Sequence, residues 1–127
     1  MRDVLGPVDH VYYWTRDMDR ALAFYTEVLG LRLIYRAGGD WAELEAPPVR
    51  LALHSTDEER PASSGTVVFR VDDLDSVRLG LEGRGVVFDE HVGEVPDRAR
   101  FATFRDPDGN PIQLIEYAGS GPTGAAP

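Results

Sequence analysis

The side chains available for chemistry in this chain are of few kinds. Its 127 residues include no cysteine, and its 13 basic residues other than histidine are all arginine. Without cysteine, the chain can form no disulfide, thiolate metal ligand or cysteine nucleophile. Without lysine, it cannot use a lysine Schiff base. Any reaction would have to use His, Asp, Glu, Tyr or Arg side chains, or a bound metal.

Three ring side chains at strand spacing are the first candidates for a site. His10, Tyr12 and Trp14 alternate with Val11 and Tyr13, and alternation places every second side chain on one face of a strand. If Val11 and Tyr13 pack on a helix, the other three line the opposite, concave face. His10 then has two interpretations: a buried histidine hydrogen-bonded across that face, or a ligand-contacting residue or general base, which neutral imidazole allows near pH 7.

The segment that carries these rings occurs twice. Residues 10–19 return in similar form as residues 66–75, an offset of 56 residues and nearly half of the chain. Both copies predict a strand that runs into a helix cap. Because a solenoid needs at least about three repeats, the pattern indicates a duplicated half-domain. The second copy places three residues on the matching surface: Thr66, Val68 and Arg70.

The aromatic and basic residues of the concave face suit a small ligand. Tyr12, Trp14 and Trp41 could stack a planar compound and would favour a cation, or they could pack as ordinary core residues. Arg70 occupies the repeat position of Trp14. It could clamp a carboxylate or phenolate, or form a structural ion pair with one of the two glutamates in residues 43–45.

The elements that must position these residues follow one order in both halves. The first half predicts strands over residues 8–14, 31–37, 41–45 and 49–54, with a helix after the first strand that Asp17 caps and Gly30 ends. After a linker over residues 56–64, the second half predicts strands over 66–71, 86–90, 100–105 and 111–117. Its helix begins after Asp73 and ends at Gly83 or Gly85.

These elements predict an α+β fold of two tandem βαβββ modules, about residues 7–55 and 65–117, forming a curved half-barrel around a cavity. The 43% hydrophobic content suits one domain over residues 1–117. Residues 118–127, rich in Gly, Pro and Ala, are expected to be a disordered tail.

Charge and hydropathy exclude two partner classes. The net charge of −9 argues against nucleic acid, because phosphate-binding proteins need a basic surface. No apolar run approaches the ~18 residues of a membrane span, and the amino terminus lacks the apolar stretch of a signal peptide. A cytoplasmic protein that binds neither nucleic acid nor membrane is expected.

Several motifs, taken together and in order, resemble those of the vicinal oxygen chelate superfamily, which includes glyoxalase I, extradiol dioxygenases and bleomycin-resistance proteins. The resemblance rests on four segments: residues 9–11, 16–20, 24–30 and 106–113. It implies paired βαβββ modules around a cavity and a homodimer, whose modules can be exchanged between chains.

The same resemblance implies four positions for metal ligands, on the first and last strands of each module. Carried over to this sequence, they are His10, about Leu51, Thr66 and Gln113. A divalent ion prefers histidine and carboxylate donors, and only His10 is a strong one. No cofactor is expected, although His10 and Gln113 would hold a divalent metal if a dimer partner supplied a carboxylate.

The sequence therefore favours a metal-independent binding protein similar to the bleomycin-resistance branch, an antibiotic-resistance class. It would hold an aromatic or cationic small molecule through Tyr12, Trp14, Trp41, Arg70, Thr66 and Gln113. The alternatives are a metal-dependent lyase, isomerase or dioxygenase anchored on His10 and Gln113, and a metal-free isomerase with His10 as catalytic base. A third alternative is an accessory module that acts through its dimer surface.

Overall fold

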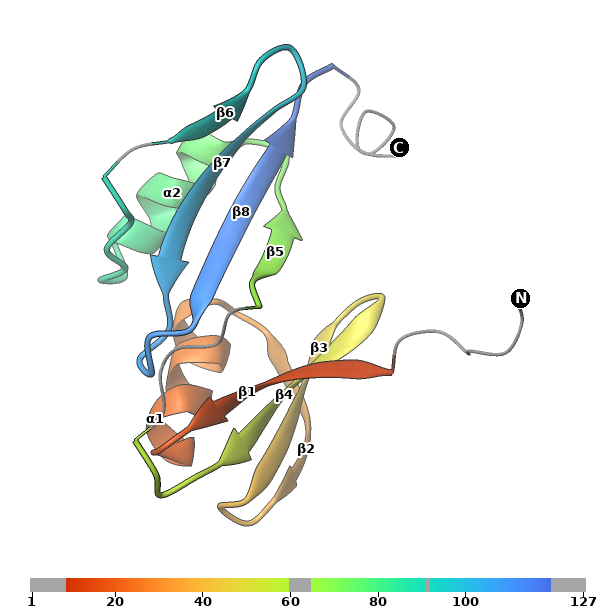
Figure 1. Ribbon diagram of the computed structural model, residues 1–127, viewed down its shortest axis with the longest axis vertical. Helices are drawn as coiled ribbons and strands as arrows, with labels where there is room; N and C mark the ends of the chain where they lie inside the picture. Colours follow the sequence, from red (N-terminus) through yellow and green to blue (C-terminus); the bar gives the residue numbers. More distant parts are fainter. Residues whose placement is uncertain (1–8, 60–64, 91, 120–127) are drawn as a thin grey trace, which may run out of the picture. The chain divides into compact units, whose positions relative to one another are not determined.

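The computed structural model describes residues 9–59, 65–90 and 92–119. The chain divides into two compact units, Met1–Pro61 and Ala62–Pro127, which are described one at a time (Figure 1). Residues 60–64 of the predicted linker and residues 120–127 of the predicted tail lie outside the described residues.

The first unit is a four-stranded sheet with one helix. Its strands follow the order β1-β4-β3-β2, with β1 parallel to β4 and the other pairs antiparallel. The elements in chain order are β1 (His10–Thr15), α1 (Met18–Ala23), a π-helical turn η1 (Phe24–Val28), β2 (Arg32–Ala37), β3 (Trp41–Ala46) and β4 (Val49–Ser55).

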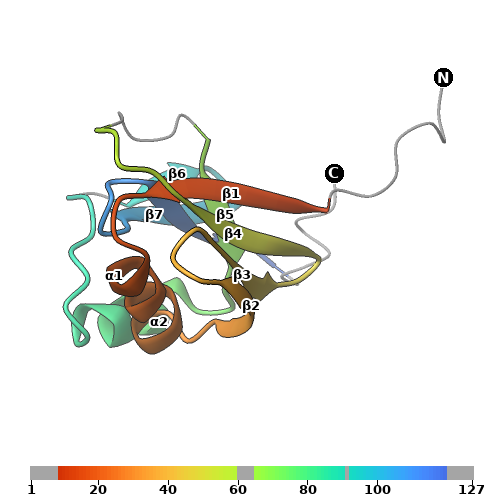
Figure 2. The ribbon, with the colours of Figure 1, turned by 90° about the horizontal axis from the view of Figure 1, so that it is seen from below.

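The helical run formed by α1 and η1 begins and ends where its sequence predicts. The Asp17 side chain caps it by accepting a hydrogen bond from the Arg20 backbone N–H at 3.1 Å. The run closes through the π-helical turn, and Gly30 then adopts a φ of 79°, a left-handed conformation that favours glycine. Met18 and Tyr25 are buried, and α1 lies against one face of the sheet (Figure 2).

Alternation along the strands divides the first sheet into two faces. Tyr13 in β1, Leu44 in β3, and Leu51 and Leu53 in β4 are buried. Val11, expected on the same face as Tyr13, is 39% exposed near the start of β1. The other face therefore receives the alternate residues, among them the predicted site residues of β1 and β3.

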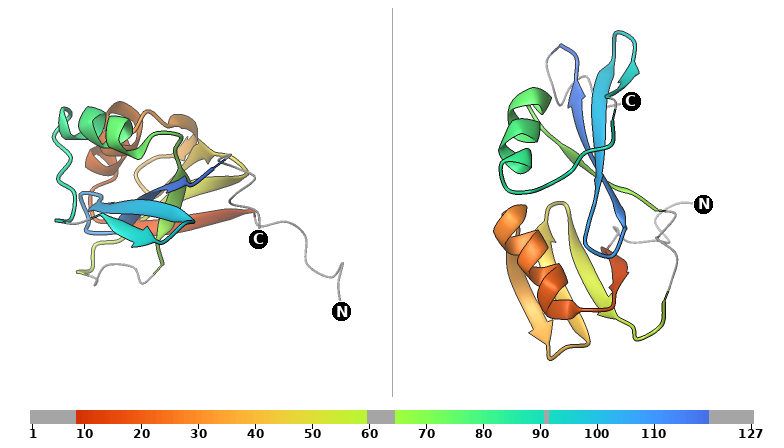
Figure 3. Two further views of the ribbon diagram at one scale, coloured as in Figure 1. Left: turned by 90° about the horizontal axis from the view of Figure 1, so that it is seen from above. Right: turned by 90° about the vertical axis from the view of Figure 1, so that its left-hand side faces the viewer.

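The second unit repeats this architecture. Its strands follow the order β5-β8-β7-β6, with β5 parallel to β8 and the other pairs antiparallel. The elements are β5 (Val67–Arg70), α2 (Leu74–Glu82), β6 (Gly93–Val95), β7 (Ala99–Arg105) and β8 (Pro111–Tyr117). Helix α2 lies beside one face of this sheet (Figure 3). The predicted α+β class with two similar modules is confirmed, and both sheets are open.

Helix α2 is capped twice at its start. Asp73 accepts a hydrogen bond from the Ser76 backbone N–H at 3.1 Å, and Glu116 of β8 accepts one from the Leu74 N–H at 2.7 Å. The helix ends at Glu82, and Gly85 rather than Gly83 has the positive φ, 94°. Of the described helices, none is both long and apolar enough to span a membrane.

The strand predicted over residues 86–90 is wrong. Val86 and Phe88 are buried and Val87 is 84% exposed, so the alternation is real, but only Phe88 forms a bridge, to Phe104. The edge strand is instead Gly93–Val95. Beyond this single bridge, Val86 and Phe88 are packing residues, and the Phe88 and Phe104 ring centres lie 5.1 Å apart.

Candidate functional site

Five rings gather on the face of the first sheet that lies opposite α1. His10, Tyr12 and Trp14 come from β1, Trp41 from β3 and His54 from β4. Trp14 and Trp41 are both register partners of His54, so pairing brings three of these rings together. We call these five residues the aromatic face.

The rings of the aromatic face contact one another mostly at an angle. The Trp14 and His54 centres are 4.5 Å apart, and the Tyr12 centre is 5.6 Å from Trp14 and 5.9 Å from Trp41. His10 meets Trp41 edge to face at 5.4 Å, a favoured geometry for aromatic pairs. Tyr12 remains 46% exposed, so the set is ordered yet open to a ligand.

An ionic network borders the aromatic face. His10 Nδ1 lies 2.8 Å from an Asp9 carboxylate oxygen, and Arg50 donates to both Asp9 and Glu43. Trp41 Nε1 also donates to Glu43, at 2.8 Å. The hydrogen bond with His10, and then the charge of Arg50, lower the pKa of Asp9. The network fixes the His10 and Trp41 rings from one side.

The two glutamates considered as partners of Arg70 bind arginines of their own sheet. Arg50 donates to Glu43 at 3.0 Å. Arg32 donates twice to Glu45, at 3.1 and 3.0 Å, and this contact, together with the arginine charge, lowers the pKa of Glu45. Neither carboxylate is therefore left for Arg70 or for a metal without breaking an existing pair.

Two members of this site were missed by sequence reasoning. They are His54 of the aromatic face and Arg50 of the ionic network beside it. The signal was present in β4, because Leu51 and Leu53 face the helix and strand alternation then turns Arg50, Ala52 and His54 to the opposite face.

The predicted site residues of the second unit lie on or beside its sheet. Thr66 is exposed and precedes β5, and Gln113 of β8 donates to the Thr103 hydroxyl at 3.2 Å. Arg70 ends β5, and its guanidinium carbon lies 5.9 Å from the centre of the Tyr117 ring. Arg70 thus contacts an aromatic ring rather than a carboxylate.

The register corrects one predicted metal position. Tyr12 pairs with Ala52 in the first sheet, and its repeat equivalent Val68 pairs with Gln113 in the second. Ala52, rather than Leu51, is therefore the equivalent of Gln113. The side chains of Ala52 and Leu51 both lack an atom that could bind a metal, so this correction does not improve the metal site.

The donor set does not fit a divalent metal. His10 is its one strong ligand, while Thr66 and Gln113 are neutral and belong to the other unit. Within residues 9–59, 65–90 and 92–119, no group of three or more His, Asp or Glu side chains could hold an ion. Neutral oxygen donors do not offset the desolvation of a divalent cation.

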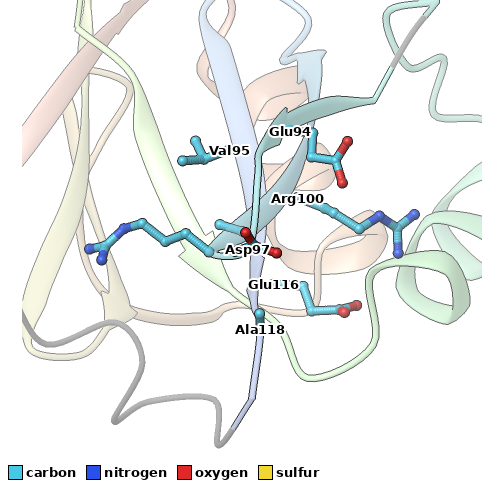
Figure 4. Close-up of a pocket in the computed structure, with 8 residues that line it drawn as sticks. Glu94, Val95, Asp97, Arg100, Glu116 and Ala118 are labelled. Carbon is cyan, nitrogen blue, oxygen red and sulfur yellow. The ribbon is translucent and has the colours of Figure 1, made fainter.

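Each unit also has a hollow apart from the aromatic face. One, of about 380 Å³, is lined by Asp9, Ile34, Glu45, Pro47, Pro48, Val49 and Arg50. The other, of about 270 Å³, is lined by Glu94, Val95, Asp97, Arg98, Ala99, Arg100, Glu116 and Ala118 (Figure 4).

The charges in the second hollow compensate one another. Glu94, Arg100 and Glu116 are register partners across β6, β7 and β8, and they extend to the same side in Figure 4. Arg100 also binds Asp75 of α2 at 2.9 Å. That hydrogen bond and the charge of Asp75 raise the pKa of Arg100, and the two glutamates add to the shift. This row ties the sheet to the start of α2.

The fold and the repeated modules define a class of protein. Residues 8–114 match the family described as Glyoxalase/Bleomycin resistance protein/Dioxygenase superfamily, and the chain belongs to this superfamily. The family resemblance seen in the sequence motifs is thereby confirmed.

Particular relatives follow from the comparisons. The chain is 30% identical over 125 residues to the uncharacterized protein YaeR of Escherichia coli K12, covering 88% of this chain and 97% of that protein. TnmS3, an antibiotic binding protein from Streptomyces sp. CB03234, aligns with a TM-score of 0.76 at 28% identity, covering 92% of this chain and 100% of that one. Lactoylglutathione lyase from Agrobacterium tumefaciens shares the fold, with a TM-score of 0.74 at 22% identity over 90% of this chain and 96% of that one.

Proposed function

We propose that this protein binds a planar aromatic small molecule against the aromatic face, without a metal. The observation that carries the proposal is the gathering of five rings from three strands on the sheet face opposite the helix. Large aromatic groups left partly exposed together are typical of a binding surface.

The electrostatics of this face favour a cationic or electron-poor ring. Aromatic faces attract positive charge, and the Trp41 indole donates to the carboxylate of Glu43. The chain as a whole carries a net charge of −9, which would draw cations toward it at low ionic strength. The fold similarity to the antibiotic binding protein TnmS3 adds support for a small-molecule ligand.

Tryptophan fluorescence tests the proposal directly, because the chain has two tryptophans and both lie on the aromatic face. The full-length protein is titrated with proflavine, a planar cation, and with a neutral polycyclic compound. We expect saturable quenching that weakens in Tyr12→Ala and persists in Leu79→Ala, which alters an exposed residue of α2. Absence of saturable quenching by either compound would reject the proposal.

A second candidate is a metal-free isomerase with His10 as base, favoured by the Asp9–His10 contact. If Nδ1 carries the proton toward Asp9, Nε2 is left as the proton acceptor. The variant His10→Ala separates the classes: a binding protein loses modest affinity, an enzyme loses most turnover, and an accessory module loses neither. The metal-dependent reactions anchored on His10 and Gln113 are less well supported, because the donor set does not fit an ion.

We also propose that the protein works as a cytoplasmic homodimer, as membership of this superfamily suggests. Thr66, Arg70 and Gln113 remain proposed ligand contacts of the second unit. Their individual replacement by Ala, read by a titration with the same compounds, tests this proposal.

A further inference from the structure

Two arginines of the second unit differ from six other described arginines. Carboxylates pair with Arg32, Arg36, Arg50, Arg78, Arg100 and Arg105. Arg70 and Arg98, within the described part of the chain, form no ion pair, although acidic residues outnumber basic ones by 22 to 13. Both are exposed, and the contact that each makes is with one ring.

That ring is Tyr117, the last residue of β8. The guanidinium carbons of Arg70 and Arg98 lie 5.9 and 5.7 Å from its centre, within the distance at which a ring attracts a cation. The two arginines come from opposite sides of β8, since β5 and β7 are its neighbours in the sheet (Figure 1). A cation–π contact holds a guanidinium through its face and leaves its N–H donors available.

The backbone fixes both arginines in place. The Arg98 carbonyl accepts from the Ala118 N–H at 2.7 Å, and its N–H donates to Val95 at 2.9 Å. Next to Arg70, the Val71 N–H donates to the Ile115 carbonyl of β8 at 2.9 Å. The cluster is therefore built from anchored sheet positions rather than from free chain ends.

Two nearby carboxylates, those of Glu94 and Glu116, are directed to the other side of this sheet. Glu116 precedes Tyr117 in β8, so alternation turns it to the opposite face, where it caps α2 by accepting from Leu74. Glu94 pairs in register with Arg100 on that same side. Arg70 and Arg98 thus form no ion pair with the described carboxylates, and two positive charges beside one ring favour a bound anion.

We propose that Arg70, Arg98 and Tyr117 form a binding site for a small carboxylate. The planar guanidinium fork matches a carboxylate in bidentate geometry, and Tyr117 has both guanidinium carbons within 5.9 Å of its ring centre. This inference goes beyond the proposed function, because it assigns an anionic ligand to Arg70 together with Arg98 and Tyr117, and its evidence is independent of the aromatic face.

Calorimetric titration of the full-length protein with benzoate, at low ionic strength, tests the site. Benzamide has the same shape without the charge and should not bind. We expect Arg70→Gln and Arg98→Gln each to weaken benzoate binding by about tenfold, the loss of one charge-assisted contact. Arg105→Gln, which removes the same charge from a paired arginine of the same sheet, should change affinity by less than about twofold.

Two substitutions of Tyr117 provide a second test of the site. Tyr117→Phe keeps the ring and should retain benzoate affinity, whereas Tyr117→Leu removes the ring and should weaken it. Circular dichroism checks that each variant is folded. Failure of benzoate to bind, equal binding of benzamide, or unchanged benzoate affinity in both Arg70→Gln and Arg98→Gln would overturn the inference.

Discussion

Asp9 shows how the ionic network conditions a histidine at the site. Its carboxylate is exposed, yet the hydrogen bond with His10 and the charge of Arg50 lower its pKa. A lowered pKa in the folded state means that the contact stabilises the fold at neutral pH, and that this contribution is lost as the pH falls through the lowered pKa. His10 should therefore keep this partner throughout the physiological pH range.

We expect a carboxyl-detected NMR titration to find the pKa of Asp9 below its ordinary value. Arg50→Gln should bring it back toward that value, because the opposite charge is removed. Arg32→Gln serves as the control, since it should raise the pKa of Glu45 and leave that of Asp9 unchanged. If the pKa of Asp9 is the same in Arg50→Gln as in the parent protein, the charge of Arg50 does not act on Asp9 and the proposed ionic network is wrong.

His54 gives a residue-scale test of the aromatic face. Its ring centre lies 4.5 Å from that of Trp14 and 5.5 Å from that of Trp41. Removing the His54 ring therefore removes a contact from each indole. We expect His54→Ala to weaken proflavine binding by about threefold to tenfold, the worth of one aromatic pair. Unchanged affinity in fluorescence titration would remove His54 from the site.

Single residues also show where prediction from sequence succeeds. The alternation of His10, Tyr12 and Trp14 was sufficient to place them on one face, because strand geometry is local. Arg98 could not be found in this way, since it lies just before β7 and meets Tyr117 through the pairing of β7 with β8. Tertiary pairing, rather than pattern, makes that contact.

At the scale of elements, β6 depends on one glycine. A Cβ at Gly93 would lie 2.3 Å from ring atoms of Phe101, so Gly93→Ala forces the ring or the strand to move. We expect a loss of about 1–3 kcal/mol in the free energy of unfolding, typical of overpacking. Urea denaturation measures it.

Gly80 is the matched control. It lies in α2, and a Cβ there would meet no atom within 4 Å. Gly80→Ala should therefore stabilise the protein by about 0.5–1 kcal/mol, the helix preference of alanine over glycine. Equal effects of the two substitutions would show that β6 is not packed against Phe101.

The helices could be predicted from their caps and turns, whereas the position of strand β6 could not be predicted from the sequence. Asp17 and Asp73 cap α1 and α2 through local contacts, which a sequence displays directly. Residues 93–95 contain one strongly apolar residue and pair with β7 through a hairpin. The buried Val86 and Phe88 carried a stronger strand pattern, because burial and pairing give the same alternation.

For the whole molecule, duplication kept the architecture and changed the chemistry. Both units have the order βαβββ, yet the repeat position of Trp14 in the aromatic face is Arg70, beside Tyr117. The sequence revealed the repeat and the family, since both rest on many positions. It could not reveal which residues of each sheet face contact one another, because those contacts depend on register.

The proposed homodimer is a prediction at this scale. Sedimentation equilibrium should give twice the chain mass of 14.0 kDa over the protein concentrations used for ligand titration. A mass that stays at 14.0 kDa would exclude the dimer, and with it any carboxylate from a partner that could complete a metal site at His10.

The central claim, a ligand held on the aromatic face, is tested most directly by the indole N–H signals in a ¹H–¹⁵N NMR spectrum. The chain has two tryptophans, Trp14 and Trp41, and Trp14→Phe assigns the two signals. We predict that proflavine moves both signals saturably and with one dissociation constant. Two indole signals that stay in place while proflavine is added would contradict the account.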